Sequence, residues 1–575
     1  MVSGPELLLA SLPLLVAGVL LVGFLWPATR AMPLAWLTAV FVGYFAWGMP
    51  VNWIAAASIN GAITAITILW IVFGALFVLY ILQEAGAFDR INRGFAAVSD
   101  DRRVQIVLLA FFLATFIEGA AGFGTPAAVV APLLLALGFP ALASVVVAII
   151  GHIIAVTYGA VGTPIIIGIR SPLQVFEAEI NEGGFTVLGF ADQVAAWAAT
   201  YHALVGFVMP FIAVLMAVHF FGGEDSDLSD AYEVAPLCLF AGVAFAVPYW
   251  VSAWFLTAEF PSLIGSMVGG AVTVAVLRAG YLLPDSEWDF PPREEWPDHW
   301  VGSIEPGDTD DAIDVDEEMS LLKAWSPYVL LVVLLVVTRA VDPISSAISN
   351  PDFGVQIGDV TVGIVLAWET ILGTDISGSI AWVSVPGFWL IVSALVAVPV
   401  FGMSGEAVGD ALSETGRKLV SPIIALIFVI AMVQVMLQSG NPPGVEPEGM
   451  IVVLARATAD TLGPAYPAVA ALIGALGAAM AGSNTVSNIT FSGFQFEAAG
   501  RVGAPRQLVV GAQAVGGAIG NLVAIHNLVA ALATVGLVGS EGRVMRLNFI
   551  VLLYYSTAVG ALTMLFCYVF FPGLF

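Results

Sequence analysis

Charged residues are scarce in this chain: Asp, Glu, Lys and Arg make up 10% of its 575 residues, whereas about a quarter is typical of a soluble domain. Cysteine is nearly absent. Cys238 and Cys567 both lie in apolar runs, which argues against a disulfide framework and a cysteine-based metal site. No nucleotide-binding motif is present, so the sequence indicates no built-in ATP drive and no cofactor. The net charge of −26 favours no nucleic-acid partner.

Long apolar runs are abundant instead. Hydrophobic residues make up 59% of the chain, and repeated runs of about 20 residues match the thickness of a bilayer. We therefore predict an all-α polytopic protein of the cell (plasma) membrane, embedded in lipid, with about 12 transmembrane helices. The start lacks a basic region and a cleavage pattern, so Leu7–Trp26 is expected to be retained as a span.

The arginine-rich loop Asp89–Arg103 is expected on the cytoplasmic side, because cytoplasmic loops are enriched in Lys and Arg. The number of preceding spans then predicts that both the N- and C-termini lie outside. Residues 281–323 form a predicted acidic cytoplasmic loop, and Tyr281–Glu318 carries fourteen acidic side chains against Arg293. One interpretation is a surface for cations or a basic partner. The favoured one is a solvated loop suited to the high-salt cytosol of a halophilic host.

Two apolar stretches, 104–137 and 465–499, are each interrupted by a short tip rich in small or polar residues. The first tip is Glu118–Pro126 and the second is Ser483–Thr490. Each limb of the first stretch has about 14 residues, roughly 20 Å of helix, which is too short to cross a bilayer. The pattern predicts two re-entrant hairpins whose irregular backbone lines a protein-buried cavity.

Each predicted hairpin is followed by a proline turn and a broken helix, 141–170 and 507–538. The order of parts repeats at an offset of 365 residues, in a first membrane half, 1–280, and a second, 324–575. The charge pattern puts the two hairpin bases on opposite faces, which predicts an inverted-topology repeat. The alternative is that glycine-rich helices simply pack closely in lipid. That alternative does not explain the polar residues crowded into the second tip.

A helix N-terminus at a tip suits a carboxylate, and the carbonyl groups of a helix C-terminus suit a cation. The tips could therefore hold a small carboxylate beside a coupling ion. The predicted substrate-binding residues are Gly122, Gly124 and Thr125 of the first tip, Ser483, Asn484, Thr485, Ser487 and Asn488 of the second tip, and Asn527 of the second broken helix.

Glu118 is the main candidate for ion coupling, because an ionisable group at membrane depth is costly unless it functions. It could carry a proton or ligate sodium; alternatively it caps the adjacent helix or pairs with a distant cation. Thr163 is expected to face the tips. His152 and His526 are rival proton carriers, although a lone histidine is more often structural.

Arg170 and Arg456 could pair with a substrate carboxylate. Both lie near the ends of predicted spans. Long basic side chains at such positions more often extend to the membrane interface.

Five motifs together carry a family resemblance: Glu118–Pro126, Lys323–Tyr328, Gly482–Asn488, Gly516–Asn527 and Ala533–Leu537. With them, nearly the whole chain resembles the L-lactate permease family. The resemblance implies symport of lactate and related 2-hydroxy monocarboxylates such as glycolate with a proton or sodium ion. The wider superfamily of ion-coupled carboxylate transporters implies a homodimer and an elevator-like transport domain that moves past a scaffold. The second tip keeps the Ser-Asn-Thr of that superfamily, whereas the first has Glu-Gly-Ala-Ala-Gly.

Three other functions were weighed against this interpretation. A sodium-coupled carrier of another organic anion, such as a dicarboxylate or a gluconate-like acid, would share the same architecture. A membrane-embedded enzyme would need a polar catalytic constellation that the apolar spans lack. A passive channel would not need two breaks at corresponding positions. We therefore expect a carrier and no enzymatic activity.

Overall fold

The structure is a computed structural model that describes residues 3–224, 226–306, 319–350, 353–445 and 448–575. Among these residues, 11 helices are long and apolar enough to cross a membrane, or up to 12 if a bent pair counts as one span. The predicted polytopic, mostly helical architecture is therefore confirmed, and the chain is a multi-pass membrane protein.

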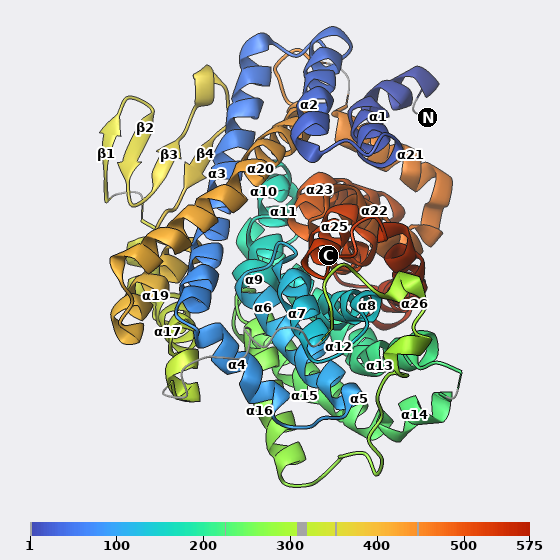
Figure 1. Cartoon of the computed structure of the whole chain (residues 1–575). Coiled ribbons are helices and arrows are strands. Elements are labelled where there is room, and N and C mark those ends of the chain that lie inside the picture. Colours follow the sequence, from blue (N-terminus) through green and yellow to red (C-terminus); the bar gives the residue numbers. More distant parts are fainter. Residues whose placement is uncertain (1–2, 225, 307–318, 351–352, 446–447) are drawn as a thin grey trace.

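Two helices of 34 residues each, α3 (Val51–Glu84) and α20 (Gly405–Gln438), pack along one another. At 1.5 Å per residue each is roughly 50 Å long, more than a bilayer needs. Around them pack α1 (Gly4–Gly18), α2 (Ala28–Phe45), α17 (Leu321–Ala340) and α19 (Pro386–Phe401). This group, which we call the α3–α20 group, lies to one side of the other helices in Figure 1.

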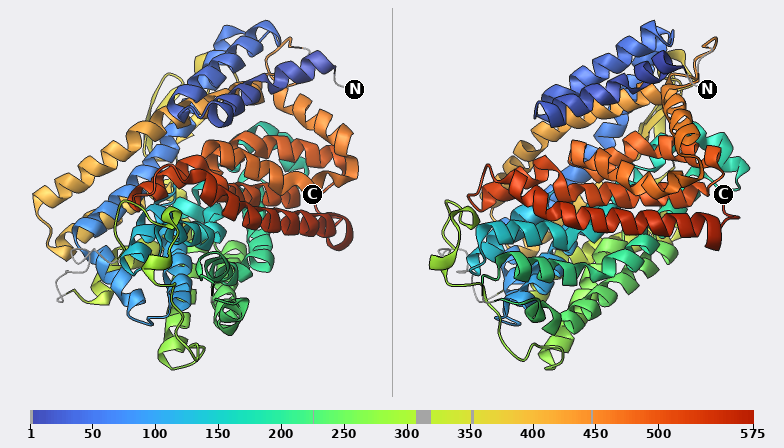
Figure 2. Two further views of the ribbon diagram at one scale, coloured as in Figure 1. Left: turned by 45° about the vertical axis from the view of Figure 1, so that its right-hand side comes forward. Right: turned by 90° about the vertical axis from the view of Figure 1, so that its right-hand side faces the viewer.

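The remaining helices form a second group that contains both predicted hairpins (Figure 2). Its α12 packs on α15 and α24, α13 packs on α8, and α15 packs on α16. The bounds of its longer helices are α12 (Val187–Val205), α13 (Met209–Phe221), α15 (Ala235–Phe255), α16 (Pro261–Arg278), α21 (Met450–Leu462) and α26 (Glu541–Leu565).

A small antiparallel sheet is the exception to the all-α prediction. It contains β1 (Gly354–Ile357), β2 (Val360–Gly363), β3 (Leu366–Trp368) and β4 (Gly378–Ile380) in sequential order. The apolar residues of Val355–Leu372, counted alone, favour an interfacial or re-entrant segment, but these residues form strands and turns instead. Ile357 pairs with Val360 across the two-residue turn Gly358-Asp359, with Gly358 at φ +61°. Alternating β-branched residues flanking such a turn favour a hairpin.

The described part of the acidic loop, residues 281–306, is not simply solvated. Trp288, Phe290 and Trp300 are buried. The Trp288 backbone N–H donates to Asp101 at 2.9 Å, and the Ser303 N–H donates to the Gly536 carbonyl at 2.9 Å. This part of the loop therefore ties the base of the first hairpin to the end of the second broken helix. Residues 307–318 lie outside the described residues.

Both chain termini lie at one end of the molecule, and the described part of the acidic loop lies near the other (Figure 2). This arrangement is what two termini on the same side of a membrane require. That the termini face outward stays a prediction.

Candidate binding site between two helix tips

The first tip joins α6 (Ala114–Ala120) to α7 (Thr125–Ala136). The π-helix Ile106–Leu113 precedes α6, and α7 packs back against both of these segments. The reversal needs left-handed backbone at Gly122, Phe123 and Gly124, with φ of +63°, +54° and +75°. Glycine adopts such angles without steric cost, whereas phenylalanine does so only where its surroundings hold it in place.

The second tip joins α22 (Ala470–Ala481) to α23 (Asn484–Val502). Gly482 ends α22 with φ +67°. Ser483 is the N-cap of α23, and its Oγ accepts a hydrogen bond from the Val486 N–H at 3.4 Å. The remaining N–H groups at the start of α23 therefore stay available at the tip.

A broken helix follows each tip. In the first half, α8 (Ala141–His152) passes into the 3₁₀ turn Ile153–Tyr158, and α9 (Gly159–Ile166) begins with left-handed residues at 160–162. In the second half, α24 (Arg506–Ile519) is followed by a 3₁₀ turn, and the chain bends by 44° into α25 (Ile525–Thr534). Each break exposes backbone carbonyl and amide groups that a continuous helix would pair.

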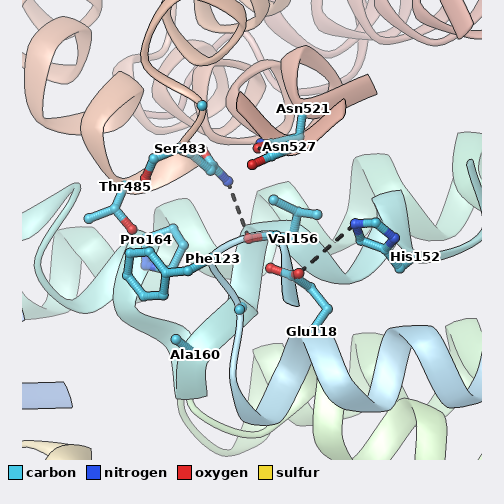
Figure 3. Close-up of a pocket in the computed structure, with 15 residues that line it drawn as sticks. Glu118, Phe123, His152, Val156, Ala160, Pro164, Ser483, Thr485, Asn521 and Asn527 are labelled. Atoms are coloured by element: carbon cyan, nitrogen blue, oxygen red, sulfur yellow. Dashed lines mark hydrogen bonds and ion pairs between the residues drawn. The ribbon is translucent and has the colours of Figure 1, made fainter. Parts of the chain in front are cut away.

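The two tips and the two breaks meet at one small cavity of about 30 Å³ (Figure 3). A volume of this size holds about one or two water molecules. The residues that line it are Glu118, Gly122, Phe123, Gly124, His152, Val156, Gly159, Ala160, Pro164, Gly482, Ser483, Asn484, Thr485, Asn521 and Asn527. Glu118 and Ser483, 365 residues apart in the sequence, therefore share one site.

Contacts across the cavity join each half to the other. The Nδ2 of Asn484 donates to the carbonyls of Val156, at 3.5 Å, and Ala514, at 3.2 Å. The Oδ1 of Asn484 is buried and has no hydrogen-bond partner. In the opposite direction, Asn527 lies directly over Gly124, where an added Cβ would come within 2.8 Å of the Asn527 Oδ1.

Glu118 is the acidic residue of the cavity, and its side chain is only 4% exposed. Its Oε2 lies 4.0 Å from Nε2 of His152. The Nδ1 of His152 is 2.7 Å from the Ala148 carbonyl, so Nδ1 carries a hydrogen and Nε2 faces the carboxyl group. At this separation the two atoms share no hydrogen bond, and each group can carry a proton by itself.

Five predicted site residues do not line this cavity. Thr125 donates to the Gly122 carbonyl at 2.7 Å, and Thr163 donates to the Ala160 carbonyl at 2.6 Å. Both hydroxyl groups therefore stabilise the turns beside the cavity. His526 is exposed and lies beside Gly482, outside the cavity wall.

Ser487 and Asn488 lie one turn deeper in α23. Ser487 donates to the Gly474 carbonyl at 2.7 Å, and Asn488 donates to the Pro164 carbonyl at 3.0 Å. Gln513 donates to the Ser487 hydroxyl at 3.1 Å. These side chains hold the second hairpin together and attach it to α9.

The cavity wall also contains residues that sequence reasoning did not select, among them Phe123, Val156, Ala160 and Pro164. Val156 contributes a carbonyl group that the 3₁₀ turn exposes, and no side-chain pattern signals that. Asn521 lies in the second predicted broken helix but is not among the predicted site residues. Its Oδ1 accepts a hydrogen bond from Asn527 at 2.7 Å, which orients Asn527 toward the first tip.

The arginines near span ends have different surroundings. Arg456 forms an ion pair with Glu448 at 3.2 Å, and Arg506 forms one with Glu179 at 2.8 Å. Arg501 pairs with Glu497 at 2.7 Å. Cytoplasmic loops are enriched in Lys and Arg, so few basic residues are expected on the predicted outer face. The ion pairs explain how these arginines are accommodated there. Arg170 lies outside the small cavity and lines a larger cleft described below.

Comparison with known proteins assigns the chain to a family. The family model described as L-lactate permease matches residues 6–570. A putative L-lactate permease of Haemophilus influenzae is 27% identical, over 93% of this chain and 94% of the relative. The L-lactate permease of Bacillus subtilis is 27% identical, over 92% and 90%, and glycolate permease GlcA of Escherichia coli is 26% identical, over 93% and 90%.

Two solved transporters resemble the chain more distantly. YdaH of Alcanivorax borkumensis has 13% sequence identity and a TM-score of 0.40, and the match covers 98% of both chains. MtrF of Neisseria gonorrhoeae has 14% sequence identity and a TM-score of 0.41, and the match covers 90% of this chain and 83% of MtrF. The family match spans both tips, both broken helices and the apolar spans that surround them. This chain therefore belongs to the L-lactate permease family, and it is a membrane transporter and not an enzyme.

Proposed function

We propose that the chain imports L-lactate and related small 2-hydroxy monocarboxylates, such as glycolate, by secondary active symport with a cation. The observation that carries this proposal is the meeting of both tips and both breaks at one small polar cavity. The names of the L-lactate and glycolate permeases to which the chain is similar support the choice of substrate.

The substrate carboxylate would bind between the N-termini of α7 and α23, which begin beside the cavity at Thr125 and Asn484. Unpaired N–H groups and the partial positive charge of a helix N-terminus stabilise an anion without a buried cation. The hydroxyl groups of Ser483 and Thr485 and the amide of Asn484 surround this position. The unpaired Oδ1 of Asn484 packs against Gly517 instead.

We favour a proton as the coupling ion. Glu118 and His152 lie in the same wall of the cavity, 4.0 Å apart, and two negative charges in one small cavity would repel each other. Binding of an anionic substrate therefore favours a protonated Glu118, and the two species load together. Sodium ligated by Glu118 and by carbonyl groups of the breaks is the alternative.

Transport requires the cavity to widen, because about 30 Å³ is too small for a lactate ion. In our proposal the second helix group, with both hairpins, moves as a transport domain against the α3–α20 group as scaffold. Two such chains would form a homodimer, and the hairpins would enter the membrane from opposite faces as an inverted repeat.

The test is accumulation of labelled lactate in liposomes that contain the purified protein. An inward proton gradient and an inward sodium gradient are imposed separately, each with the other ion balanced. Uptake above equilibrium with the proton gradient alone supports proton symport, and uptake with the sodium gradient alone supports the alternative ion. If neither gradient drives lactate but one drives a dicarboxylate or gluconate, the chain is a carrier of another organic anion.

A further inference from the structure

A second, larger polar cleft lies where the α3–α20 group and the sheet face the segment that follows α9. It has two adjoining hollows of about 530 and 350 Å³. The labels of α3, α10 (Arg170–Leu173), α20 and β4 mark its position in Figure 1. The polar residues that line both hollows are Asn60, Arg170, Ser171, Gln174 and Ser377.

All five shared residues can donate a hydrogen bond, and none is acidic. Glu177 and Asp375 line one hollow only, and Glu369 lines only the other. The junction of the hollows therefore has a guanidinium group, hydroxyl groups and amides, while the carboxylates lie to either side. Such a junction offers a small anion one positive charge and several hydrogen-bond donors.

Arg170 provides the positive charge of this cleft. Among the described residues that line either hollow there is no other Lys, Arg or His. Nor does any described carboxylate approach its guanidinium group within 4.0 Å. Asp192 acts on it only through a longer-range charge interaction. An exposed guanidinium with free donors can bind a carboxylate through two parallel hydrogen bonds.

One helical segment connects this cleft to the small cavity. Backbone hydrogen bonds of helical spacing run from Ile167 to Thr163, from Ile169 to Ile165 and from Ser171 to Ile167. Pro164 at the start of this segment lines the small cavity, and Arg170 is six residues further on. At 1.5 Å per residue, the two positions are roughly 9 Å apart along the axis.

We propose that Arg170, with Ser171, Gln174, Asn60 and Ser377, forms an outer subsite that binds the substrate carboxylate before it reaches the small cavity. The proposal rests on the proposed transport of small carboxylates. In this proposal, the guanidinium group of Arg170 attracts the anionic substrate to a chain whose net charge is strongly negative. A capture site of this kind raises the local concentration of substrate without taking part in the coupling step.

The first test is lactate uptake by the Arg170→Gln variant. Loss of a charged hydrogen bond to the substrate should raise KM about tenfold, while the maximal rate stays within about twofold of wild type because capture is separate from translocation. Arg170→Lys should restore part of the affinity, since it keeps the charge. Arg417→Gln on α20, whose side chain is 76% exposed, is the matched control and should have no effect. An unchanged KM in Arg170→Gln overturns the proposal.

The second test does not depend on transport. Cys238 and Cys567 are buried, so Ser379→Cys, at an exposed position that lines the cleft, provides an accessible thiol as reporter. Lactate or propionate should slow its modification by a negatively charged thiol reagent when Arg170 is present, but not with Arg170→Gln. Absence of protection in the presence of Arg170 overturns the subsite. Protection without gradient-driven uptake by the wild-type chain supports the subsite and overturns the proposed function.

Discussion

The Oε2 of Glu118 lies 4.0 Å from the Nε2 of His152, and Nδ1 of that histidine is held by the Ala148 carbonyl. The carboxyl group and the imidazole therefore face each other in the wall of the cavity where the tips meet. Among the described residues, no Lys or Arg lines this cavity. The proposed coupling to a proton would supply the positive charge that accompanies a bound carboxylate.

Glu118→Gln should abolish lactate accumulation driven by a proton gradient, because an amide cannot bind and release the coupling proton. Exchange of lactate for lactate across the membrane should persist, since it needs no net proton movement. The measurement is pH-jump uptake beside counterflow in the same liposomes. Glu84→Gln, at the exposed end of α3, is the control. Wild-type pH-driven uptake by Glu118→Gln would remove this residue from the coupling role.

Asn484→Ala should abolish uptake while the protein keeps its normal abundance and folding. The amide connects the second tip to the Val156 carbonyl of the first broken helix, and Asn484 lines the cavity. Loss of a buried amide whose partners stay behind costs about 1–3 kcal/mol, which a large membrane domain tolerates. Initial rates and size-exclusion profiles test this, with Asn181→Ala on the exposed face of α11 (Glu177–Glu182) as control. Wild-type transport would place the second tip outside the site.

Gly124→Ala should inactivate transport, and the strain of a left-handed backbone alone does not account for this loss. Gly124 and Gly503 have φ of +75° and +69°, so alanine pays a similar penalty at either place, about 1–2 kcal/mol. Only at Gly124 would the new Cβ meet Asn527, at 2.8 Å, whereas no atom lies within 4 Å at Gly503. Gly503→Ala should therefore transport and Gly124→Ala should not. Adding Asn527→Ala to Gly124→Ala tests whether the clash is the cause, with Asn527→Ala alone as the reference. If the double variant binds substrate less well than Asn527→Ala alone, the contact is not what limits Gly124→Ala.

Arg103→Ala should destabilise the base of the first hairpin by about 3–5 kcal/mol, because it leaves a buried carboxylate unpaired. The Arg103 side chain is fully buried and pairs with Asp101 at 2.7 Å and with Glu233 at 2.8 Å. Arg102→Ala should cost under about 1 kcal/mol, since its partner Asp289 is 64% exposed. Thermal unfolding in detergent compares the two, and equal shifts would contradict this assignment.

The same network predicts a pH dependence. Burial alone would raise the pKa of Glu233, but hydrogen bonds from Arg103 and from the Ser286 N–H lower it below its ordinary value. A carboxylate with a lowered folded-state pKa stabilises the protein above its unfolded-state pKa, and this contribution disappears as the pH falls through the folded-state value. Glu233→Gln should therefore reduce the loss of stability on acidification below about pH 4.5. An identical acid midpoint would show that Glu233 does not contribute.

The acidic surface predicts that stability increases with salt. A net charge of −26 repels itself, and the Debye length falls from about 10 Å at 0.1 M salt to about 3 Å at 1 M. The unfolding temperature should rise between these KCl concentrations. The rise should be smaller for a variant with Glu294→Gln, Glu295→Gln and Asp298→Asn in the described part of the loop. A protein that is folded and active only at low ionic strength would rule out the halophilic interpretation.

Local chemistry in the sequence determines a large part of this architecture. Apolar runs of bilayer length specify the spans, and a tip such as Glu118–Pro126 interrupts a helix because glycine and proline weaken its hydrogen-bond ladder. Hydropathy does not predict the small sheet, because the apolar residues of Val355–Leu372 resemble part of a span when counted alone. Pairing of Ile357 with Val360 depends on a turn and a partner strand, which hydropathy does not report.

Motifs along the chain predict a transporter with two tips of small or polar residues and carry the resemblance to the family. They also name Glu118, His152 and His526 as candidate ion-coupling groups. Which of those groups share a cavity depends on tertiary packing, which brings Glu118 to His152 and Asn527 to Gly124 but leaves His526 outside. It also placed Arg170 in a separate polar cleft. The physical reason is that helix breaks are set by neighbouring residues, whereas the groups that face each other across a cavity depend on how helices far apart in the chain pack.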